Sequence, residues 1–186
     1  MIMNRKGFTL VELLVMLVVL SILIAISIPN IMGILNDNKK TIAIDDASRM
    51  IETAKVRTSM DETLLPQSNG SCKIFRLSYL DKNDDYKKGP NGGTYNKNES
   101  FVLIKMEEIG AGSKTYKYNY YVRLVENVDE NNMGINNATS QEIDKKDRTI
   151  FNRDVEIIGI YDSTNISIIK DSINNKMNTS CTTIEE

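Results

Sequence analysis

The apolar residues of this sequence are concentrated in one long segment near its start. From Phe8 to Ile28 the chain is hydrophobic, and the first charged residue after Glu12 is Asp37. A helix over this stretch is about 31 Å long, close to the roughly 30 Å hydrocarbon thickness of a bilayer. The polar exceptions within it are Thr9, Glu12, Ser21 and Ser27. The pattern therefore predicts one membrane-spanning helix.

The helical pattern continues beyond Pro29 but changes character. Apolar residues recur there at i, i+4, i+7, i+8 and i+11, which traces one stripe along a helix. The stripe consists of Ala43, Ala47, Met50, Ile51 and Ala54. We therefore expect one helix from Phe8 to Met60, kinked at Pro29 because proline lacks the backbone N–H donor. Its second half, residues 37–60, is expected to pack against a sheet.

Residues 61–186 are expected to form a single globular head. Pro66 and Gly70 end the helix. The predicted strands are Cys72–Leu80, Phe101–Met106, Thr115–Val125, Thr149–Tyr161 and the short stretch Ile166–Ile169. Gly110 and Gly112 predict a hairpin turn, so the second and third strands should be antiparallel. A short helix is expected over residues 141–146, and from Asp171 a polar tail that is ordered only if Cys181 is anchored. The predicted fold class is α+β, with the long helix packed on an antiparallel sheet of about four strands.

Composition removes several kinds of chemistry. The chain has no histidine, which excludes Ser-His-Asp and Cys-His nucleophiles and zinc sites that contain histidine. Two acidic loops begin like calcium-binding loops, but Tyr86, Gly92 and Met133 stand where glycine or oxygen ligands are needed. The formal net charge is only -2, so nucleic acid is not an expected partner. We expect no cofactor and no catalysis by the chain itself.

The cysteines leave two alternatives. Cys72 and Cys181 are too few for a thiolate zinc site, but they suffice for one disulfide if the head lies in an oxidising compartment. Such a bond would close a loop of roughly a hundred residues and contribute about 4 kcal/mol on the loop-entropy model. The other reading is two reduced thiols.

Glu12 is the residue that a plain targeting segment does not explain. Arg5 and Lys6 precede the hydrophobic helix, so the positive-inside rule places the N-terminus of the chain in the cytoplasm. A permanent signal anchor and a secretory signal peptide cut after the triplet at residues 25–27 both fit this pattern. Neither reading gives a reason for a carboxylate inside a hydrophobic helix, where it costs a few kcal/mol. Cleavage between Gly7 and Phe8 would supply a partner, because it frees an ammonium group at membrane depth.

The segment from Lys6 to Glu12 followed by a long apolar run resembles the start of type IV prepilins. The resemblance implies a cleaved leader at residues 1–7 and a membrane and assembly helix at residues 8–36. In that family a prepilin peptidase cuts after the glycine, here Gly7, and methylates the new N-terminus, here Phe8. It also implies that subunit assembly involves Phe8, Thr9, Glu12 and Pro29. Glu12 would pair with the N-terminal amine of a neighbouring subunit.

The function that this resemblance implies is that of a structural subunit of a type IV pilus. Its partners would be membrane lipid at first, the prepilin peptidase, other pilin subunits, and a membrane assembly platform with its ATPase. The chain would cross the inner, or cytoplasmic, membrane once before assembly and lie in a cell-surface filament afterwards. The same pattern also occurs in pseudopilins of type II secretion or DNA-uptake systems. A membrane-tethered binding domain that never polymerises is a third reading.

Overall fold

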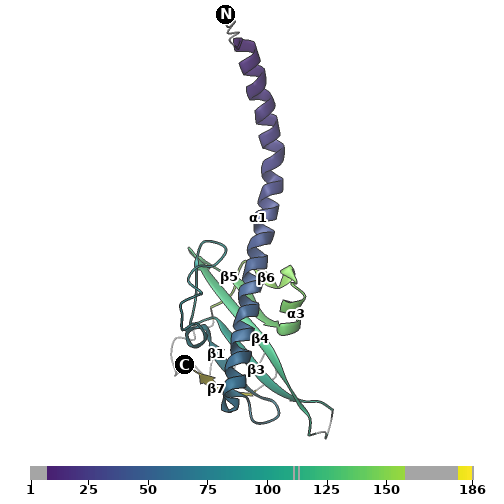
Figure 1. The fold of residues 1–186 in the computed structure, drawn as a ribbon, viewed down its shortest axis with the longest axis vertical. Coiled ribbons are helices and arrows are strands. Elements are labelled where there is room, and N and C mark those ends of the chain that lie inside the picture. Colours follow the sequence, from purple (N-terminus) through teal and green to yellow (C-terminus); the bar gives the residue numbers. More distant parts are fainter. Residues whose placement is uncertain (1–7, 111, 113, 158–179, 186) are drawn as a thin grey trace, which may run out of the picture. The chain divides into compact units, whose positions relative to one another are not determined.

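The computed structural model describes residues 8–110, 112, 114–157 and 180–185, with side chains described up to residue 157 except that of residue 30. Internal contacts divide the chain into two units, residues 1–38 and residues 39–186. The expected division lay after residue 36. The first helix, α1, runs from Leu10 to Met60 and therefore contributes to both units (Figure 1).

The first unit contains the apolar part of α1. The helix is continuous through Pro29, which lies in its interior. Continuity is compatible with proline because neighbouring backbone groups adjust around the missing donor. The predicted helix from Phe8 to Met60 is thus confirmed to within two residues at its start.

The second unit is built on a seven-stranded sheet with the strand order β6-β5-β4-β3-β1-β7, and β2 pairs with β4 off this path. All pairs are antiparallel except β1 with β7, which is parallel. The strands are β1 (Ser71–Arg76), β2 (Thr94–Tyr95), β3 (Phe101–Glu108), β4 (Tyr116–Val128), β5 (Asn131–Thr139), β6 (Phe151–Asn152) and β7 (Ser180–Glu185). The short helices are η1 (Glu62–Leu64), α2 (Leu77–Leu80), α3 (Ser140–Asp144) and η2 (Arg148–Ile150).

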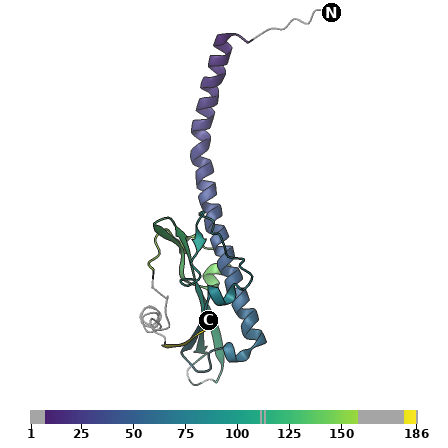
Figure 2. The ribbon, with the colours of Figure 1, turned by 90° about the vertical axis from the view of Figure 1, so that its left-hand side faces the viewer.

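The second half of α1 covers one face of this sheet (Figures 1 and 2). Every residue of the predicted apolar stripe is buried, with at most 3% of its surface exposed. The stripe packs against Phe75, Val102, Ile104, Val122 and Leu124 of the sheet. Three of its members are alanines, so the helix can approach the strands closely. The predicted α+β fold is confirmed by this packing.

The sheet is larger than predicted because two strands lie in polar sequence. β5 is rich in asparagine, and its pairing with β4 and the burial of Ile135 stabilise it. The end of the expected tail, residues 180–185 around Cys181, is ordered as the strand β7, which pairs with β1. Tertiary pairing overrides weak strand propensity in both places.

Two predicted strands were partly wrong. The stretch Cys72–Leu80 ends as a strand at Arg76, and Leu77–Leu80 forms α2. Of the predicted strand Thr149–Tyr161, the described part, residues 149–157, is a strand at Phe151–Asn152 only, while residues 148–150 form η2 and residues 153–157 have no regular structure. Residues 158–161 and the predicted strand at 166–169 lie outside the described residues. The helix expected at 141–146 is present as α3, which starts one residue earlier and ends two residues earlier.

Candidate functional site

Thr9 and Glu12 form a reciprocal hydrogen-bonded pair at the start of α1. The Thr9 amide and hydroxyl both donate to Glu12 Oε2, at 2.9 and 2.8 Å, and the Glu12 amide donates to Thr9 Oγ1 at 3.3 Å. This is a capping box, because it satisfies backbone donors that the first helical turn leaves unpaired. Within the part of the chain that the structure describes, Glu12 Oε1 has no hydrogen-bond donor. One carboxylate oxygen thus stays open for a positive group from outside.

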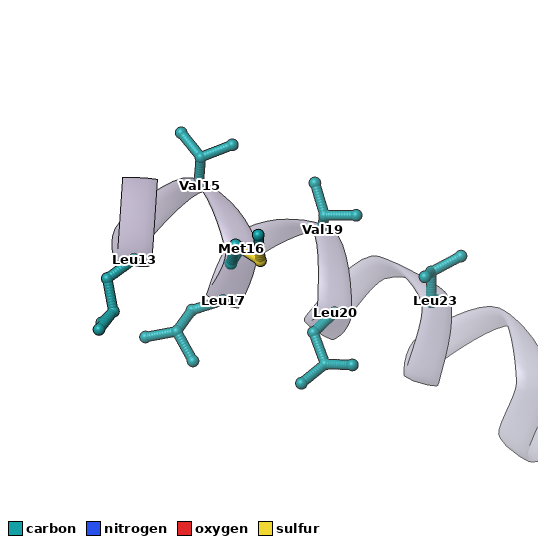
Figure 3. Close-up of a pocket in the computed structure, with 7 residues that line it drawn as sticks. All are labelled: Leu13, Val15, Met16, Leu17, Val19, Leu20 and Leu23. Atoms are coloured by element: carbon teal, nitrogen blue, oxygen red, sulfur yellow. The ribbon is translucent and has the colours of Figure 1, made fainter. Parts of the chain in front are cut away.

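The surface of α1 behind this cap is apolar on every side. Figure 3 shows apolar side chains pointing away from the helix in several directions, and they border a shallow hollow of about 530 Å³. The side chains drawn are Leu13, Val15, Met16, Leu17, Val19, Leu20 and Leu23. The helix is long and apolar enough to cross a membrane. Such a surface requires lipid or other apolar helices around it.

The two serines of this segment form hydrogen bonds inside the helix. The Ser21 hydroxyl donates to the Leu17 carbonyl at 2.7 Å, and the Ser27 hydroxyl donates to the Leu23 carbonyl at 2.8 Å. Neither serine therefore needs a polar partner in lipid. Glu12 is the one ionisable residue between Phe8 and Leu35, so the site's polar chemistry is concentrated at the helix start.

Residues 2–28 match the family model for the prokaryotic N-terminal methylation motif. The chain carries the methylation motif of type IV pilins and pseudopilins. The motif supports the resemblance found from Lys6 to Glu12, and it implies processing by a prepilin peptidase and assembly with other pilins. The motif and the apolar helix are also consistent with membrane anchoring. No curated protein and no solved structure matches the chain.

The predicted processing and assembly residues do not all lie together in the structure. Phe8, Thr9 and Glu12 lie together at the helix start, and the Phe8 side chain is 76% exposed. Pro29 lies more than four turns further along the helix and does not contact them. Gly7 lies outside the described residues. The roles of these residues in cleavage, methylation and assembly remain predictions.

Cys72 lies in β1, is fully buried and is disulfide-bonded. Cys181 is the other cysteine of the chain, and its Cα is in register with that of Cys72 across the β1–β7 pair. The backbone arrangement thus suits the predicted bond between these two residues.

The acidic loop after α2 is occupied by donors of the protein itself. Asp81 accepts hydrogen bonds from the amides of Asp85 and Tyr86, at 2.7 and 3.3 Å. The Lys97 ammonium lies 2.8 Å from Asp81 and 2.6 Å from Asp84. The described residues contain no group of three or more acidic or sulfur ligands that could hold a metal ion. This loop is therefore best explained as a structural turn closed by a lysine.

Sequence reasoning missed the buried charges of the head. Arg123 and Glu99 are 1% and 0% exposed and face each other at 3.5 Å. The carboxylate of Glu126, also buried, accepts hydrogen bonds from the Asn91 and Gly93 amides at 2.9 and 3.0 Å. The sequence offered one signal for this cluster, since Arg123 stands among apolar residues of β4 and a buried charge requires a partner.

Proposed function

We propose that this chain is a structural subunit of a type IV pilus, cleaved after Gly7, methylated at Phe8 and assembled through α1. Its observational basis is the carboxylate of Glu12, the lone ionisable group between Phe8 and Leu35, with one oxygen that no donor among the described residues reaches. Such a group is stable in a hydrocarbon environment only beside a positive charge. The methylation motif supplies that charge as a new amino terminus.

In this proposal the capping box positions the carboxylate before assembly. Thr9 binds Oε2, which orients Oε1 toward the surroundings of the helix start. The Phe8 ammonium of a neighbouring subunit then pairs with Oε1. Because each subunit provides one carboxylate and one amine on different sides of the contact, the interaction is heterologous and can repeat along a filament.

The apolar half of α1 would provide most of the contact area between subunits. Its side chains are about half exposed in the isolated chain and can pack as a bundle once lipid is removed. The head would follow as the outer layer of the filament. We further propose that Cys72 and Cys181 form the disulfide of the head, which ties β7 to β1.

The methylation motif is shared with pseudopilins, and location separates the two functions. A pilus subunit is recovered in filaments sheared from the cell surface, whereas a pseudopilin stays with the cell envelope. Both functions, pilus subunit and pseudopilin, would require an assembly platform with its ATPase.

The test is the variant Glu12→Gln, made in the producing cell. Without the carboxylate charge, the ammonium of the neighbouring subunit is left unpaired, at a cost of about 3 to 5 kcal/mol. We expect cleavage to continue while the amount of protein in sheared filaments falls more than tenfold. The matched control is Glu130→Gln, which neutralises an exposed carboxylate of the head. Normal incorporation of the Glu12 variant would favour a tethered, non-polymerising domain.

A further inference from the structure

The strand β1 lies between two strands of different origin. On one side it pairs antiparallel with β3, and on the other side parallel with β7 (Figure 1). Among the described strands, β7 pairs with β1 alone. The preceding strand among the described residues, β6, lies at the opposite edge of the sheet. Residues 153–179 therefore separate β7 from that strand in the sequence.

The edge that β7 covers belongs to the core of the head. Cys72, Ile74 and Phe75 of β1 are at most 1% exposed. Removal of β7 would leave the backbone donors and acceptors of this edge unpaired beside apolar side chains, which strongly favours renewed pairing. The β1–β7 pair is parallel and has a register shift between Cys72 and Lys73, so it is weaker per residue than a regular antiparallel pair.

We propose that the Cys72–Cys181 disulfide confines β7 to its own copy, and that after reduction the β1 edge accepts β7 of a second copy. The inference rests on the disulfide proposed above and not on filament formation. Reduction by a dithiol adds two electrons and two protons to the S–S bond, which yields two thiols and the cyclic disulfide of the reagent. Oxidised glutathione reverses the step and leaves as two glutathione thiols.

Pairing of β1 with its own β7 and pairing with β7 of a second copy have similar interaction energies. An exchanged β7 makes the same backbone pairs with β1 as the resident strand, because both copies have the same sequence. The difference is therefore the effective concentration at which each strand is presented. The connection links β7 to its own copy, so the resident strand is presented at an effective concentration that the length of the connection sets, and neighbours in a membrane patch or filament compete when they are equally concentrated. The covalent bond removes this competition.

The test uses two full-length variants with different epitope tags, Cys72→Ser and Cys181→Ser, co-expressed in the producing cell. Neither variant can form the bond alone, so a link between Cys181 of one copy and Cys72 of the other requires an exchanged β7. We expect at least tenfold more mixed-tag dimer on a non-reducing gel than the same two variants give when expressed separately and mixed after lysis. Peptide mass spectrometry should identify the Cys72–Cys181 link. Monomers alone, with both variants accumulating, would overturn the proposal.

A second measurement needs no substitution and decides the matter if the variants do not accumulate. Wild-type full-length chains with two tags are mixed in detergent, reduced with dithiothreitol and reoxidised with oxidised glutathione. We expect mixed-tag dimers whose fraction rises with protein concentration, and none when the reduction step is omitted. Intrachain bonds at every concentration, or dimers without reduction, would contradict the proposal. The same experiment on Glu12→Gln should give the same dimers, which separates this inference from the filament hypothesis.

Discussion

The buried pair of Arg123 and Glu99 provides the strongest prediction for the stability of the head. Arg123 donates from Nε to the Glu99 carbonyl at 3.2 Å, from Nη1 to Asn136 Oδ1 at 2.6 Å, and from Nη2 to the Glu156 carbonyl. Burial lowers the pKa of the Arg123 guanidinium, while the Glu99 carboxylate opposes that shift. The cluster joins β4, β5 and two connections, so its loss should affect the whole head.

The perturbation is Arg123→Met. It replaces the guanidinium with an apolar side chain and leaves the Glu99 charge buried without its main partner. Breaking one side of a buried pair costs about 3 to 5 kcal/mol. At about 2 to 4 °C per kcal/mol for a chain of this size, the melting temperature should fall by roughly 6 to 20 °C. The double variant Arg123→Met with Glu99→Gln should recover part of this loss, because the carboxylate that Arg123→Met leaves without its arginine is then removed as well.

The assay is urea unfolding and thermal unfolding of the full-length chain in detergent, each monitored by near-ultraviolet circular dichroism. The control is Lys87→Met, which removes an exposed ion pair with Asp84 whose side chains are 69% and 49% exposed. That change should cost less than about 1 kcal/mol. If the unfolding free energy of Arg123→Met lies within about 1 kcal/mol of the wild type, or if the double variant is no more stable than Arg123→Met, the account of this cluster is wrong.

Two further predictions concern the loop that follows α2. Burial raises the pKa of Tyr86 from 10.0 to about 12, so the folded chain holds this proton more tightly than the unfolded chain. The resulting stability is present below pH 10 and lost as the pH rises to about 12, and Tyr86→Phe should flatten that fall in urea midpoints. Gly89→Ala would place a Cβ 2.2 Å from the buried Glu126 carboxyl carbon, and it should lower the unfolding free energy by about 1 to 3 kcal/mol. Lys88→Ala, at an exposed neighbouring position, should leave the unfolding free energy nearly unchanged. A Gly89→Ala variant with the stability of the wild type would contradict the packing described.

The helix could be predicted from the sequence because its pattern is long and regular. The apolar run from Phe8 to Ile28 and the stripe after Pro29 each repeat over several turns, and local periodicity of this kind needs no knowledge of the rest of the fold. The strands β3 and β4 were also predictable, since each is rich in apolar or aromatic residues. Glu12 was predictable for a different reason, because a single carboxylate in an apolar segment is energetically costly and requires a partner.

The missed features depend on contacts between distant residues. β5 is a strand because β4 presents a long pairing edge, and nothing in its asparagine-rich sequence indicates this. β7 depends on β1, which lies about a hundred residues earlier in the chain. The bond from Thr9 to Glu12 was not predicted, although a threonine three residues before a glutamate is the pattern of a capping box. The segment was interpreted as a membrane helix, and Glu12 was assigned a partner outside the chain rather than this local one.

The central claim is that maturation exposes an amino group at Phe8 that Glu12 can bind, and the most direct test is the N-terminal peptide of the protein sheared from producing cells. Mass spectrometry of this peptide should show a chain that starts at Phe8 and carries one additional methyl group on its amino terminus. A chain that starts at Ile28, or one that still starts at Met1 or Met3, would contradict the account.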